Sequence, residues 1–388
     1  MRDSTGTRLK TIWMAPKLAF RNLFHDVVSL TVTLTGIVFS VVLVAVQCGL
    51  YLGSERTIAA VLDQVKADLW IVPIGTKSFD DPAFLNGREK YAALSTRGVA
   101  AAEDLMVGFA SWRKPKGGST AVLVVGSDWT AGGLSPWNIQ EGSLGALEKP
   151  DAVAADRTYF TDLGINGLDD RAEINGRRVK VAAVTHGIRS FTTLPYIFTT
   201  LPRAESLLDA SPGQASYALV RVTPGANIDD VRARLSARLP DVEVLTHDEF
   251  RTRSLDYWLF QTGAGAALIA GAILGLIVGV VIVAQTLYAS TKDHLNEFAT
   301  LRALGASGSY IHHVILMQAL ISALVGYVLG MGLSMAVVWA AADTTMTVVM
   351  TPKLAAALFG VTIGMCVIAA MSAILKVTRI DPAGVFSR

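Results

Sequence analysis

Four long runs without Asp, Glu, Lys or Arg dominate the pattern of hydrophobic and polar positions. They are Val27–Leu52, Gly263–Ala289, Ile311–Ala342 and Leu354–Leu375. Each is long enough for the roughly 20 residues that a membrane-spanning helix needs. Residues 53–262 are of mixed polar composition, whereas the connections between the later runs are short. The pattern predicts an integral membrane α-helical protein with four transmembrane helices and a large domain inserted between helices 1 and 2.

The composition agrees with a membrane protein and excludes two other classes. Of the 388 residues, 52% are hydrophobic and only 17% are charged, which argues against a water-soluble cytosolic enzyme. Lys and Arg (34) nearly balance Asp and Glu (32), so the chain lacks the basic surplus of a nucleic-acid-binding protein. Both cysteines, Cys48 and Cys366, lie in apolar runs, and the polar region therefore has no disulfide framework.

Basic residues near the ends of the runs predict the orientation in the membrane. Segments 1–26, 290–310 and 376–388 carry Lys and Arg close to the spans, and such segments remain in the cytoplasm. The domain of residues 53–262 then faces outward. Because the chain has apolar helices and no outer-membrane barrel pattern, we expect a multi-pass protein of the bacterial inner membrane with cytoplasmic N and C termini.

Segment 1–26 predicts an amphipathic helix before the first span. Its apolar residues alternate with basic ones, as suits a helix that lies among lipid headgroups. A short cytoplasmic helix packed on protein accounts for the pattern equally well. The residues concerned are Leu9, Lys10, Ile12, Trp13, Lys17, Leu18, Phe20, Arg21 and Leu23.

Small residues recur at helical spacing within the spans. Gly271, Gly275 and Gly279 lie four residues apart in the second run, and Gly326 and Gly330 do so in the third. Such spacing lets helix backbones approach closely. The glycines predict either an interface that slides or rotates, including one between two copies of the chain, or static packing within one bundle.

No Asp, Glu, Lys or Arg, residues that mark proton relays and ion pathways, lies in the interior of any span. Their interior polar residues are Gln47, Gln285, Gln318 and scattered Ser and Thr. Membrane-embedded charges are typical of ion-coupled transporters and channels. The sequence therefore argues against a secondary transporter.

The outward segment, residues 53–262, predicts an α+β domain carried on helical stalks. The stalks are Ser54–Lys66 and Asp248–Gln261. Asn227 is expected to cap a helix whose first turn contains Asp229 and Asp230. The expected strands are Asp68–Ile74, Ala121–Ser127, Arg178–Val184, Tyr196–Thr199, Ser216–Thr223 and Val242–Leu245, and the expected helices are Pro202–Leu208 and Ile228–Leu239.

This domain shows no pattern that predicts catalysis, metal binding or a cofactor. Its histidines lack a partner at metal-ligand spacing, and no nucleophile elbow is present. The doublets Asp80-Asp81 and Asp169-Asp170 are expected to be solvated loop residues. Residues 110–118 (ASWRKPKGG) form a basic loop that fits either a contact with a partner or lipid headgroups, or an exposed turn.

The connection between the second and third spans, residues 290–310, predicts a short amphipathic helix under the membrane. Glu297 and Arg302 lie on its polar side, and Gly305 is a natural helix stop. Taken alone, it is a membrane-surface turn. Its apolar face consists of Leu295, Phe298, Leu301 and Leu304.

This stretch resembles the E-x-x-x-L-[RK]-A-[LIM]-G-[AY]-S signature of FtsX/MacB-type ABC transporter permeases, the type VII or mechanotransmission class. Two other motifs agree with the resemblance. Leu18–Leu23 (LAFRNL) is similar to the L-A-x-R-N-L segment of the family, and Arg379–Ala383 followed by Val385-Phe386 is similar to the R-x-D-P-A-x-V-F tail of its DevC-like branch. The order of spans and domain also matches.

The resemblance implies a coupling site that docks on a separate ATP-hydrolysing subunit. The chain has no G-x-x-x-x-G-K-[ST] loop, so ATP and Mg would bind to the partner and this chain would be no enzyme by itself. The resemblance further implies a homodimer of this chain with two ATPase subunits. The coupling residues implied are Glu297, Phe298, Leu301, Arg302, Ala303, Leu304, Gly305 and Ala306.

The leading hypothesis is the permease of an export system that moves an amphiphilic or lipid-like substrate, together with a periplasmic adaptor and an outer-membrane channel. An FtsX-like activator of a hydrolase and a lipoprotein-releasing permease are related alternatives. A membrane receptor or scaffold with no ATPase is the alternative from another class. The sequence does not identify the cargo.

Overall fold

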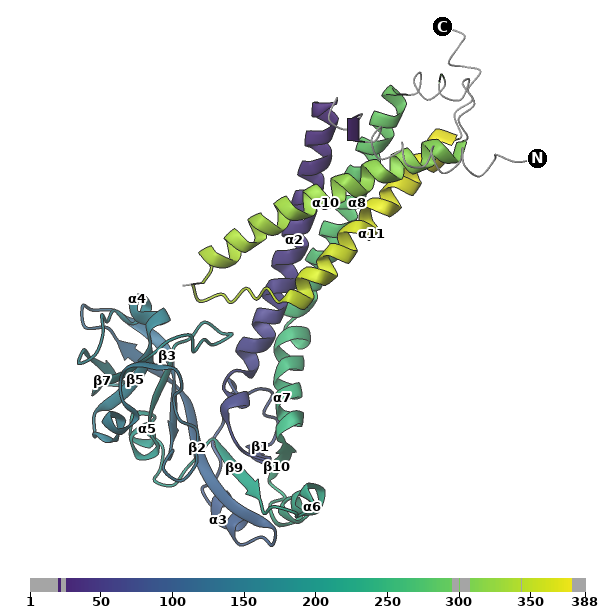
Figure 1. The fold of residues 1–388 in the computed structure, drawn as a ribbon. Helices are drawn as coiled ribbons and strands as arrows, with labels where there is room; N and C mark the ends of the chain where they lie inside the picture. Colours follow the sequence, from purple (N-terminus) through teal and green to yellow (C-terminus); the bar gives the residue numbers. More distant parts are fainter. Residues whose placement is uncertain (1–19, 22–25, 295–299, 301–307, 343, 379–388) are drawn as a thin grey trace. The chain divides into compact units, whose positions relative to one another are not determined.

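The computed structural model describes residues 20–21, 26–294, 300, 308–342 and 344–378, drawn as ribbons in Figure 1. By its internal contacts the chain forms two compact units. One comprises residues 1–52, 267–342 and 348–388, and the other comprises residues 53–266 and 343–347. The first unit is the helical bundle and the second is the domain inserted between its first two helices.

Among the described residues, four helices are long and apolar enough to cross a membrane. Each overlaps one of the four uncharged runs of the sequence, so the predicted fold class is confirmed. A large α/β domain separates the first helix from the second, also as predicted. The four helices are α2 (Val27–Ala59), α8 (Ala264–Asp293), α10 (Gly308–Ala340) and α11 (Pro352–Thr378).

The bundle has a small-residue core to which all four helices contribute. Alanines supply much of it, so the backbones lie close together and dispersion forces hold them. On α11 the buried face repeats at helical spacing through Cys366, Ala369, Ala370 and Ala373. The other helices add Ile37, Val41, Val283, Leu287, Ile315, Ala319 and Ala323.

The inserted domain contains one sheet whose strands follow the order β10-β1-β9-β2-β3-β8-β5-β7-β4, while β6 pairs with both β2 and β7. Most neighbours are antiparallel, and the pairs β3–β8 and β5–β7 are parallel. The strands are β1 (Leu69–Pro73), β2 (Val99–Arg113), β3 (Ser119–Ser127), β4 (Ile139–Gly142), β5 (Ala152–Asp156), β6 (Arg171–Ile174), β7 (Arg177–Thr185), β8 (Tyr196–Thr200), β9 (Tyr217–Val222) and β10 (Val242–Thr246).

Strand β6 pairs with both β2 and β7 and thereby closes a ring of six strands, in the order β2, β3, β8, β5, β7 and β6. All of these strands lie within residues 99–200, which the structure describes without a gap. Side chains from all six strands meet in one buried cluster that includes Trp112, Val124, Val153, Ile174, Val181 and Ile197. That cluster is the core of the ring. The adjacent residues Leu123, Val125, Ala154 and Phe198 belong to a second cluster. The central strands are therefore buried on both faces.

The remaining part of the sheet, β10-β1-β9 with the first half of β2, is open and covered by helices. On one face, Leu69 and Ile71 of β1 pack with α3 (Glu89–Leu94) and α6 (Ile228–Arg238). On the other face, Trp70 and Val72 pack in the second cluster with Phe250 of α7 (His247–Asp256). Figure 1 shows the long β2 passing from this open part into the ring.

Short helical segments connect the strands, and two of the helices, α6 and α7, begin with side-chain caps. Asn227 caps α6: its Oδ1 accepts hydrogen bonds from the backbone N–H of Asp229 and Asp230, as predicted. Thr246 and Glu249 form a reciprocal capping box at the start of α7. The other segments are η1 (Leu62–Gln64), η2 (Leu144–Glu148), η3 (Arg157–Tyr159), α4 (Phe160–Leu163), α5 (Leu201–Leu207) and the π-helical turn η4 (Tyr257–Gln261).

All six expected strands and both expected helices of the domain are present, as β1, β3, β7, β8, β9, β10, α5 and α6. The prediction of a basic loop at residues 110–118 was partly wrong, because Ala110–Arg113 form the end of β2 and pair with β3. The run Asp248–Gln261 is helical but is not continuous with α8. Gly263, with φ of +80°, separates η4 from α8, and this left-handed conformation suits glycine.

Candidate functional site

The predicted ATPase-coupling residues lie outside the described residues of the structure. These are Glu297, Phe298, Leu301, Arg302, Ala303, Leu304, Gly305 and Ala306. The helices on either side are described: α8 ends at Asp293 and α10 begins at Gly308. Of the N-terminal motif Leu18–Leu23, Phe20 and Arg21 are helical and exposed, and the motif at Arg379–Ala383 again falls outside the described range.

Three of the predicted packing glycines form a contact stripe along α8. A Cβ atom added at Gly271 would lie 2.7 Å from Nε2 of Gln47, and one at Gly279 would lie 2.4 Å from Oγ of Ser40. A Cβ atom added at Gly275 would lie 3.0 Å from Cδ2 of Leu43. All three neighbours belong to α2 of the same chain. The glycines thus let α2 approach α8 more closely than a larger residue would allow.

Gly326 and Gly330 of α10 make the same kind of approach to α2. Added Cβ atoms would lie 2.5 Å from Ile37 Cγ2 and 2.8 Å from Val41 Cβ, respectively. The glycines of α8 and α10 therefore both face α2. By contrast, Gly360 and Gly364 of α11 have no described atom within 4 Å of an added Cβ.

Two polar side chains of α2 lie in this apolar contact. Ser40 donates a hydrogen bond from Oγ to the backbone oxygen of Gly275 at 2.8 Å. Gln47 has its Oε1 buried without a hydrogen-bond partner among the described residues. Because apolar packing alone gives little specificity between helices in lipid, such polar groups favour one register of α2 against α8.

The segment that enters the inserted domain is tied to the segment that leaves it by one arginine. Arg251 of α7 donates from Nε to Oδ1 of Asp63 in η1 at 2.9 Å, and its Nη2 lies 4.0 Å from Oε1 of Glu55 at the end of α2. The pairs are partly exposed, so each contributes modestly to stability. They do fix the two stalk segments to one another.

The loop between β7 and β8 has a rigid base. Asp156, buried at the end of β5, accepts hydrogen bonds from Oγ1 of Thr185 at 2.9 Å and from the N–H of Ile188 at 2.8 Å. The Tyr159 hydroxyl accepts a hydrogen bond from the N–H of Ser190 at 3.1 Å. A buried carboxylate satisfied by several donors specifies one loop conformation.

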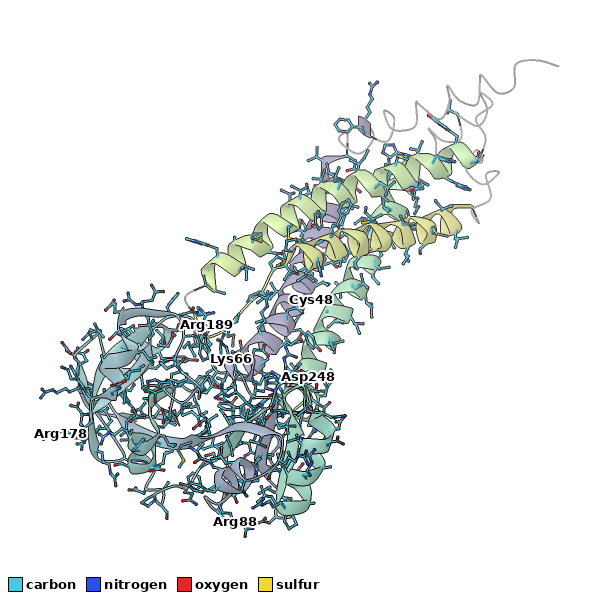
Figure 2. The ribbon with its side chains drawn as sticks, turned by 60° about the horizontal axis from the view of Figure 1, so that its bottom comes forward. Cys48, Lys66, Arg88, Arg178, Arg189 and Asp248 are labelled. Atoms are coloured by element: carbon cyan, nitrogen blue, oxygen red, sulfur yellow. The ribbon has the colours of Figure 1, made fainter. Side chains whose placement is uncertain are left out.

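From this base the loop reaches two further parts of the same unit. Arg189, labelled in Figure 2, donates from Nη1 to Oγ1 of Thr347 at 3.2 Å. Phe191 packs on Trp258 of η4, with ring centroids 5.2 Å apart. The loop thus contacts the stalk before α8 and the segment between α10 and α11.

Thr347 also contacts the C-terminal end of α2. Oγ1 of Thr57 donates to the backbone oxygen of Gly53 at 2.8 Å and lies 3.4 Å from Oγ1 of Thr347. Gly53 lies so close to the backbone oxygen of Thr347 that an added Cβ would be 1.7 Å from it. Arg189, Thr347 and Thr57 together form what we call the Thr347 clamp. Nothing in the hydrophobic pattern of the sequence indicates this clamp.

The acidic doublets of the domain have different surroundings. Asp80 is buried, so the expectation of two solvated residues was wrong for this carboxyl, whereas its neighbour Asp81 is exposed. Asp169 forms an ion pair with Lys180 at 2.7 Å, and Asp170 accepts the N–H of Asn166. In the described part of the chain, no group of three His, Cys, Asp or Glu residues is placed to hold a metal ion.

Comparison with models of protein families identifies the family of this chain. A model of the MacB-like periplasmic core domain matches residues 30–238, more than half of the chain, and a model of the FtsX-like permease C-terminal region matches residues 269–382. The chain belongs to the FtsX/MacB-type ABC transporter permeases. Such a permease is a multi-pass membrane subunit, is not itself an enzyme, and implies an ATPase partner that handles ATP.

Similar proteins agree with this FtsX/MacB-type assignment. Two uncharacterized ABC transporter permeases of Mycobacterium tuberculosis, from strains CDC 1551 and H37Rv, are 25% identical over 363 residues. The match covers 92% of this chain and 94% of each of theirs.

Solved structures also resemble part of the chain. The periplasmic region of MacB from Actinobacillus actinomycetemcomitans is 10% identical, with a TM-score of 0.37, and covers 51% of this chain and 96% of its own. The extracellular domain of the noncanonic ABC-type transporter YknZ from Gram-positive bacteria is 13% identical, with a TM-score of 0.34, and covers 46% of this chain and 99% of its own.

Proposed function

We propose that this permease transmits ATP-driven motion from a separate cytoplasmic ATPase to its outward domain and thereby exports an amphiphilic or lipid-like substrate. It acts in the bacterial inner membrane with both termini in the cytoplasm. Its tail motif favours the DevC-like branch. In this scheme two copies of the chain bind two ATPase subunits, and a periplasmic adaptor and an outer-membrane channel complete the export route.

The Thr347 clamp is the observation that carries this proposal. Through Arg189 and Thr57, the segment between α10 and α11 is joined to the outward end of α2 and to a loop whose base is fixed by Asp156. Arg251 joins both stalk segments as well. Movement of the helices would therefore reach the ring of strands through hydrogen-bonded contacts.

The proposal gives the glycine stripe a mechanical role. Where apolar helices meet through small residues, few side chains interdigitate, so few have to move when one helix shifts along the other. We propose that α2 shifts along Gly271, Gly275 and Gly279 of α8, and along Gly326 and Gly330 of α10, when the ATPase closes. The ATPase would act on the coupling residues named above, which are Glu297, Phe298, Leu301, Arg302, Ala303, Leu304, Gly305 and Ala306.

A purification from native membranes tests the partners. The tagged chain, extracted in mild detergent, should bring with it an ABC ATPase subunit and a periplasmic adaptor, identified by mass spectrometry. A cell-wall hydrolase in place of the adaptor would favour the FtsX-like function, and a lipidated protein would favour the lipoprotein-releasing one. If no ATPase were recovered even after crosslinking, this proposal would be excluded and the receptor or scaffold hypothesis would remain.

Variants of the coupling segment test the transmission itself. Glu297→Ala and Leu301→Ala should lower the ATPase activity of the reconstituted complex and weaken ATPase binding. Thr300→Ala, at a position that the family motif leaves open, is the control and should behave as the parent. If both test variants retained full activity and binding, this segment would not be the coupling element.

A variant of the clamp separates hydrolysis from transmission. Thr347→Val keeps the shape of the side chain but removes the hydroxyl that Arg189 and Thr57 contact. The complex should still hydrolyse ATP, while the ATP-dependent change in hydrogen exchange at residues 186–193 should be lost. Thr344→Val is the control in the same segment. An unchanged exchange response in Thr347→Val would show that the clamp does not transmit motion.

A further inference from the structure

Three Asn-Gly pairs lie in the inserted domain: Asn86-Gly87, Asn166-Gly167 and Asn175-Gly176. Asparagine is a chemically labile residue, and a following glycine leaves its backbone nitrogen unhindered beside the side-chain amide. Reaction between these two groups requires the asparagine side chain and the next peptide group to rotate toward one another. The rate at each pair therefore depends on how firmly the fold holds both groups.

The pair Asn175-Gly176 is held on the side chain and on the backbone. Oδ1 of Asn175 accepts the N–H of Ser111 at 2.9 Å, and its Nδ2 donates to the backbone oxygen of Leu207 at 2.9 Å. The pair forms the two-residue loop between β6 and β7, and both residues have a positive φ, +47° and +78°. Because paired strands flank this loop, neither group can rotate without breaking these contacts.

The pair Asn86-Gly87 is held by a weaker contact. Nδ2 of Asn86 donates to Oδ2 of Asp241 at 3.4 Å. Gly87 has a φ of +86°, and a Cβ atom added to it would lie 2.6 Å from the backbone oxygen of Gly213, so its peptide is packed against another turn. This pair is therefore restrained, though less than Asn175-Gly176.

The pair Asn166-Gly167, in the turn between α4 and β6, lacks these restraints. Asn166 is exposed, and within the described residues its side-chain amide makes no hydrogen bond. The N–H of Gly167 has no acceptor among those residues either, and a Cβ atom added to Gly167 would meet nothing within 4 Å. The contact that remains is from the backbone N–H of Asn166 to Oδ2 of Asp170, at 2.6 Å. Both reacting groups of this pair are therefore free to rotate.

We propose that Asn166 is a site of spontaneous deamidation. The backbone nitrogen of Gly167 attacks Cγ of Asn166 and closes a five-membered succinimide, while the bond from Cγ to the side-chain nitrogen breaks and ammonia leaves with the proton of the Gly167 N–H. Water then opens the ring at either carbonyl, which gives aspartate or isoaspartate. The reaction needs no enzyme, oxidant or ATP, so this inference is independent of the proposed export function.

Deamidation acts at the entry to the strand that closes the ring. The carboxylate of Asp170 accepts the Asn166 N–H, and its backbone oxygen accepts the N–H of Val181 in β7. A new carboxylate at residue 166 repels that of Asp170, and isoaspartate also adds one carbon to the main chain. Strand β6 shares only two residue pairs with β2, so the ring should open more readily at this strand after the reaction.

Ageing of the purified full chain tests the site. The protein in nanodiscs, without ATPase, is incubated at neutral pH in water that carries heavy oxygen, which marks the products formed during the incubation, and its peptides are mapped by mass spectrometry. Product should accumulate fastest at Asn166. One hydrogen bond holds the side chain of Asn86 and two hold that of Asn175, so their rates should be about fivefold and about thirtyfold lower.

An unfolded sample separates the effect of the fold from the intrinsic chemistry. In guanidinium chloride the hydrogen bonds and the hairpin are lost, and the residue before each asparagine is Leu or Ile in all three pairs. The three pairs should then react at similar rates. A difference that persisted after unfolding would come from the local sequence instead.

A variant tests the attacking nitrogen. Gly167→Ala places a methyl group beside this nitrogen and should remove most of the product at Asn166, and the open space around Gly167 allows the substitution. Gly145→Ala is the matched control, because an added Cβ there also meets nothing within 4 Å, and it should react like the parent. Melting curves of each variant show that it is folded.

Hydrogen exchange measures the consequence for the ring. Asn166→Asp is one of the two reaction products and should exchange the amide protons of Arg171–Ile174 about two- to fivefold faster than the parent, since the charge repulsion is between exposed groups. Asn86→Asp, which adds the same charge at a distant pair, is the control and should leave these residues unchanged. Parental exchange in Asn166→Asp would exclude an effect of the new charge on β6.

Three results would overturn the assignment of the site. Equal rates at the three pairs of the folded protein would show that the fold does not select Asn166. Undiminished product in a folded Gly167→Ala variant would exclude attack by this nitrogen. No product at Asn166 in the folded protein, over a time in which the unfolded chain reacts, would show that the turn protects it. A failure of ATPase coupling would alter none of these outcomes.

Discussion

The hydroxyl of Tyr196 donates a hydrogen bond to Oδ1 of Asp80 at 2.5 Å inside the domain core. Asp80 is 6% exposed and directly follows Phe79, whose ring packs against Trp70 and Tyr217. Burial raises the pKa of this carboxyl to about 6, although the hydrogen bond from Tyr196 opposes the rise. The charged form of Asp80 therefore destabilises the fold relative to the protonated form.

The contribution of Asp80 to the stability of the inserted domain should fall as the pH rises from about 4 to about 6. The native carboxyl of Asp80 keeps its proton until its raised pKa, whereas the unfolded chain releases it near the ordinary value of 3.8. At about 1.4 kcal/mol per pKa unit, the loss is roughly 3 kcal/mol. Asp104, whose pKa burial also raises to about 6, adds to the same trend.

Asp80→Asn should flatten this dependence, because an amide accepts the Tyr196 hydroxyl without a charge. Thermal unfolding between pH 4 and 8 measures the effect, and the variant should melt above the parent at pH 8. Asp81→Asn, at the exposed neighbour, is the control and should keep the slope of the parent. A parental slope in Asp80→Asn would mean that this carboxyl does not titrate in the range.

Gly279→Leu should destabilise the helical bundle by about 1 to 3 kcal/mol, the usual range for overpacking. Its side chain would meet both Oγ of Ser40 and Sδ of Met365, which lie 2.4 and 2.5 Å from an added Cβ. The melting temperature in a fixed detergent measures the loss. Gly360→Leu, where an added Cβ meets nothing within 4 Å, should melt like the parent. Destabilisation by Gly360→Leu instead would indicate that α11 has a close neighbour in the assembled protein.

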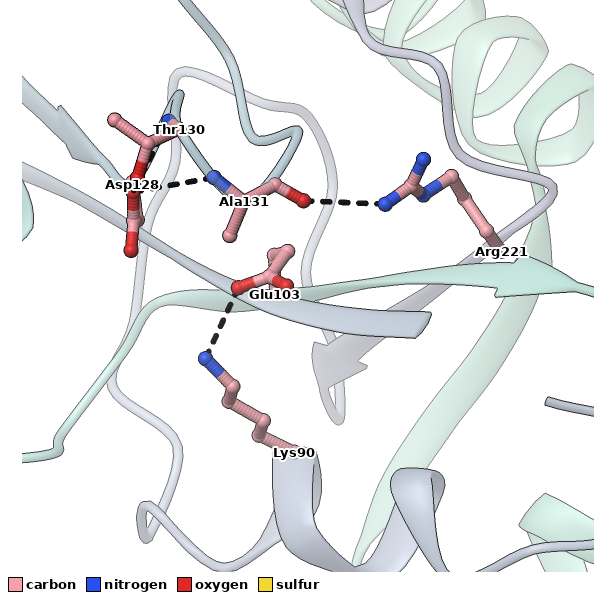
Figure 3. A network of polar contacts seen from close by, with 6 residues as sticks. All are labelled: Lys90, Glu103, Asp128, Thr130, Ala131 and Arg221. Carbon is pink, nitrogen blue, oxygen red and sulfur yellow. Dashed lines mark hydrogen bonds and ion pairs between the residues drawn. The ribbon is translucent and has the colours of Figure 1, made fainter. Parts of the chain in front are cut away.

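The ion pair between Lys90 of α3 and Glu103 of β2, drawn in Figure 3, should couple more strongly than an exposed pair. Its side chains are 23% and 14% exposed, against 74% and 35% for Arg113 and Glu173. Double-mutant cycles on both pairs give the two coupling energies. We expect about 1 kcal/mol or more for Lys90–Glu103 and a few tenths for the exposed pair. Equal values would show that burial does not strengthen the contact.

Asn227→Ala should cost about 1 kcal/mol, because the N–H groups of Asp229 and Asp230 lose their acceptor at the start of α6. Asn227→Ser supplies another acceptor oxygen and should therefore retain most of the stability that Asn227→Ala loses. Chemical unfolding of the three proteins gives the comparison. A loss in Asn227→Ser as large as that in Asn227→Ala would argue against capping as the reason.

The bundle and six strands of the domain could be predicted from the sequence because their patterns are regular. Uncharged apolar runs of more than 20 residues are typical of membrane-spanning helices and rare in water-soluble domains, and β3 and β7 are rich in valine. Asn227 was found because an N-cap is a local signal. Glycine spacing indicated close helix contact, but spacing does not reveal which helix is the neighbour, and here it is α2 for both α8 and α10.

Strands β2 and β5 were missed because neither has the residue pattern of a typical strand. All five residues of β5 are buried and three are alanines, so neither alternation nor β-branched residues mark the strand. In β2, Glu103 and Asp104 interrupt the apolar run, and Lys90, the ion-pair partner of Glu103, comes from α3. The Thr347 clamp joins residues far apart in the chain, so no local pattern could indicate it.

Strand β2 belongs to both parts of the sheet. Its residues up to Leu105 pair with β9, and those from Leu105 onward pair with β3, so one residue lies opposite both Tyr217 and Ser127. If β2 detached from the open sheet or from the ring, the hydrophobic core of the other part would also be exposed. The open sheet and the ring should consequently unfold in one cooperative transition, and their slowest amide protons should exchange at a common rate set by global opening.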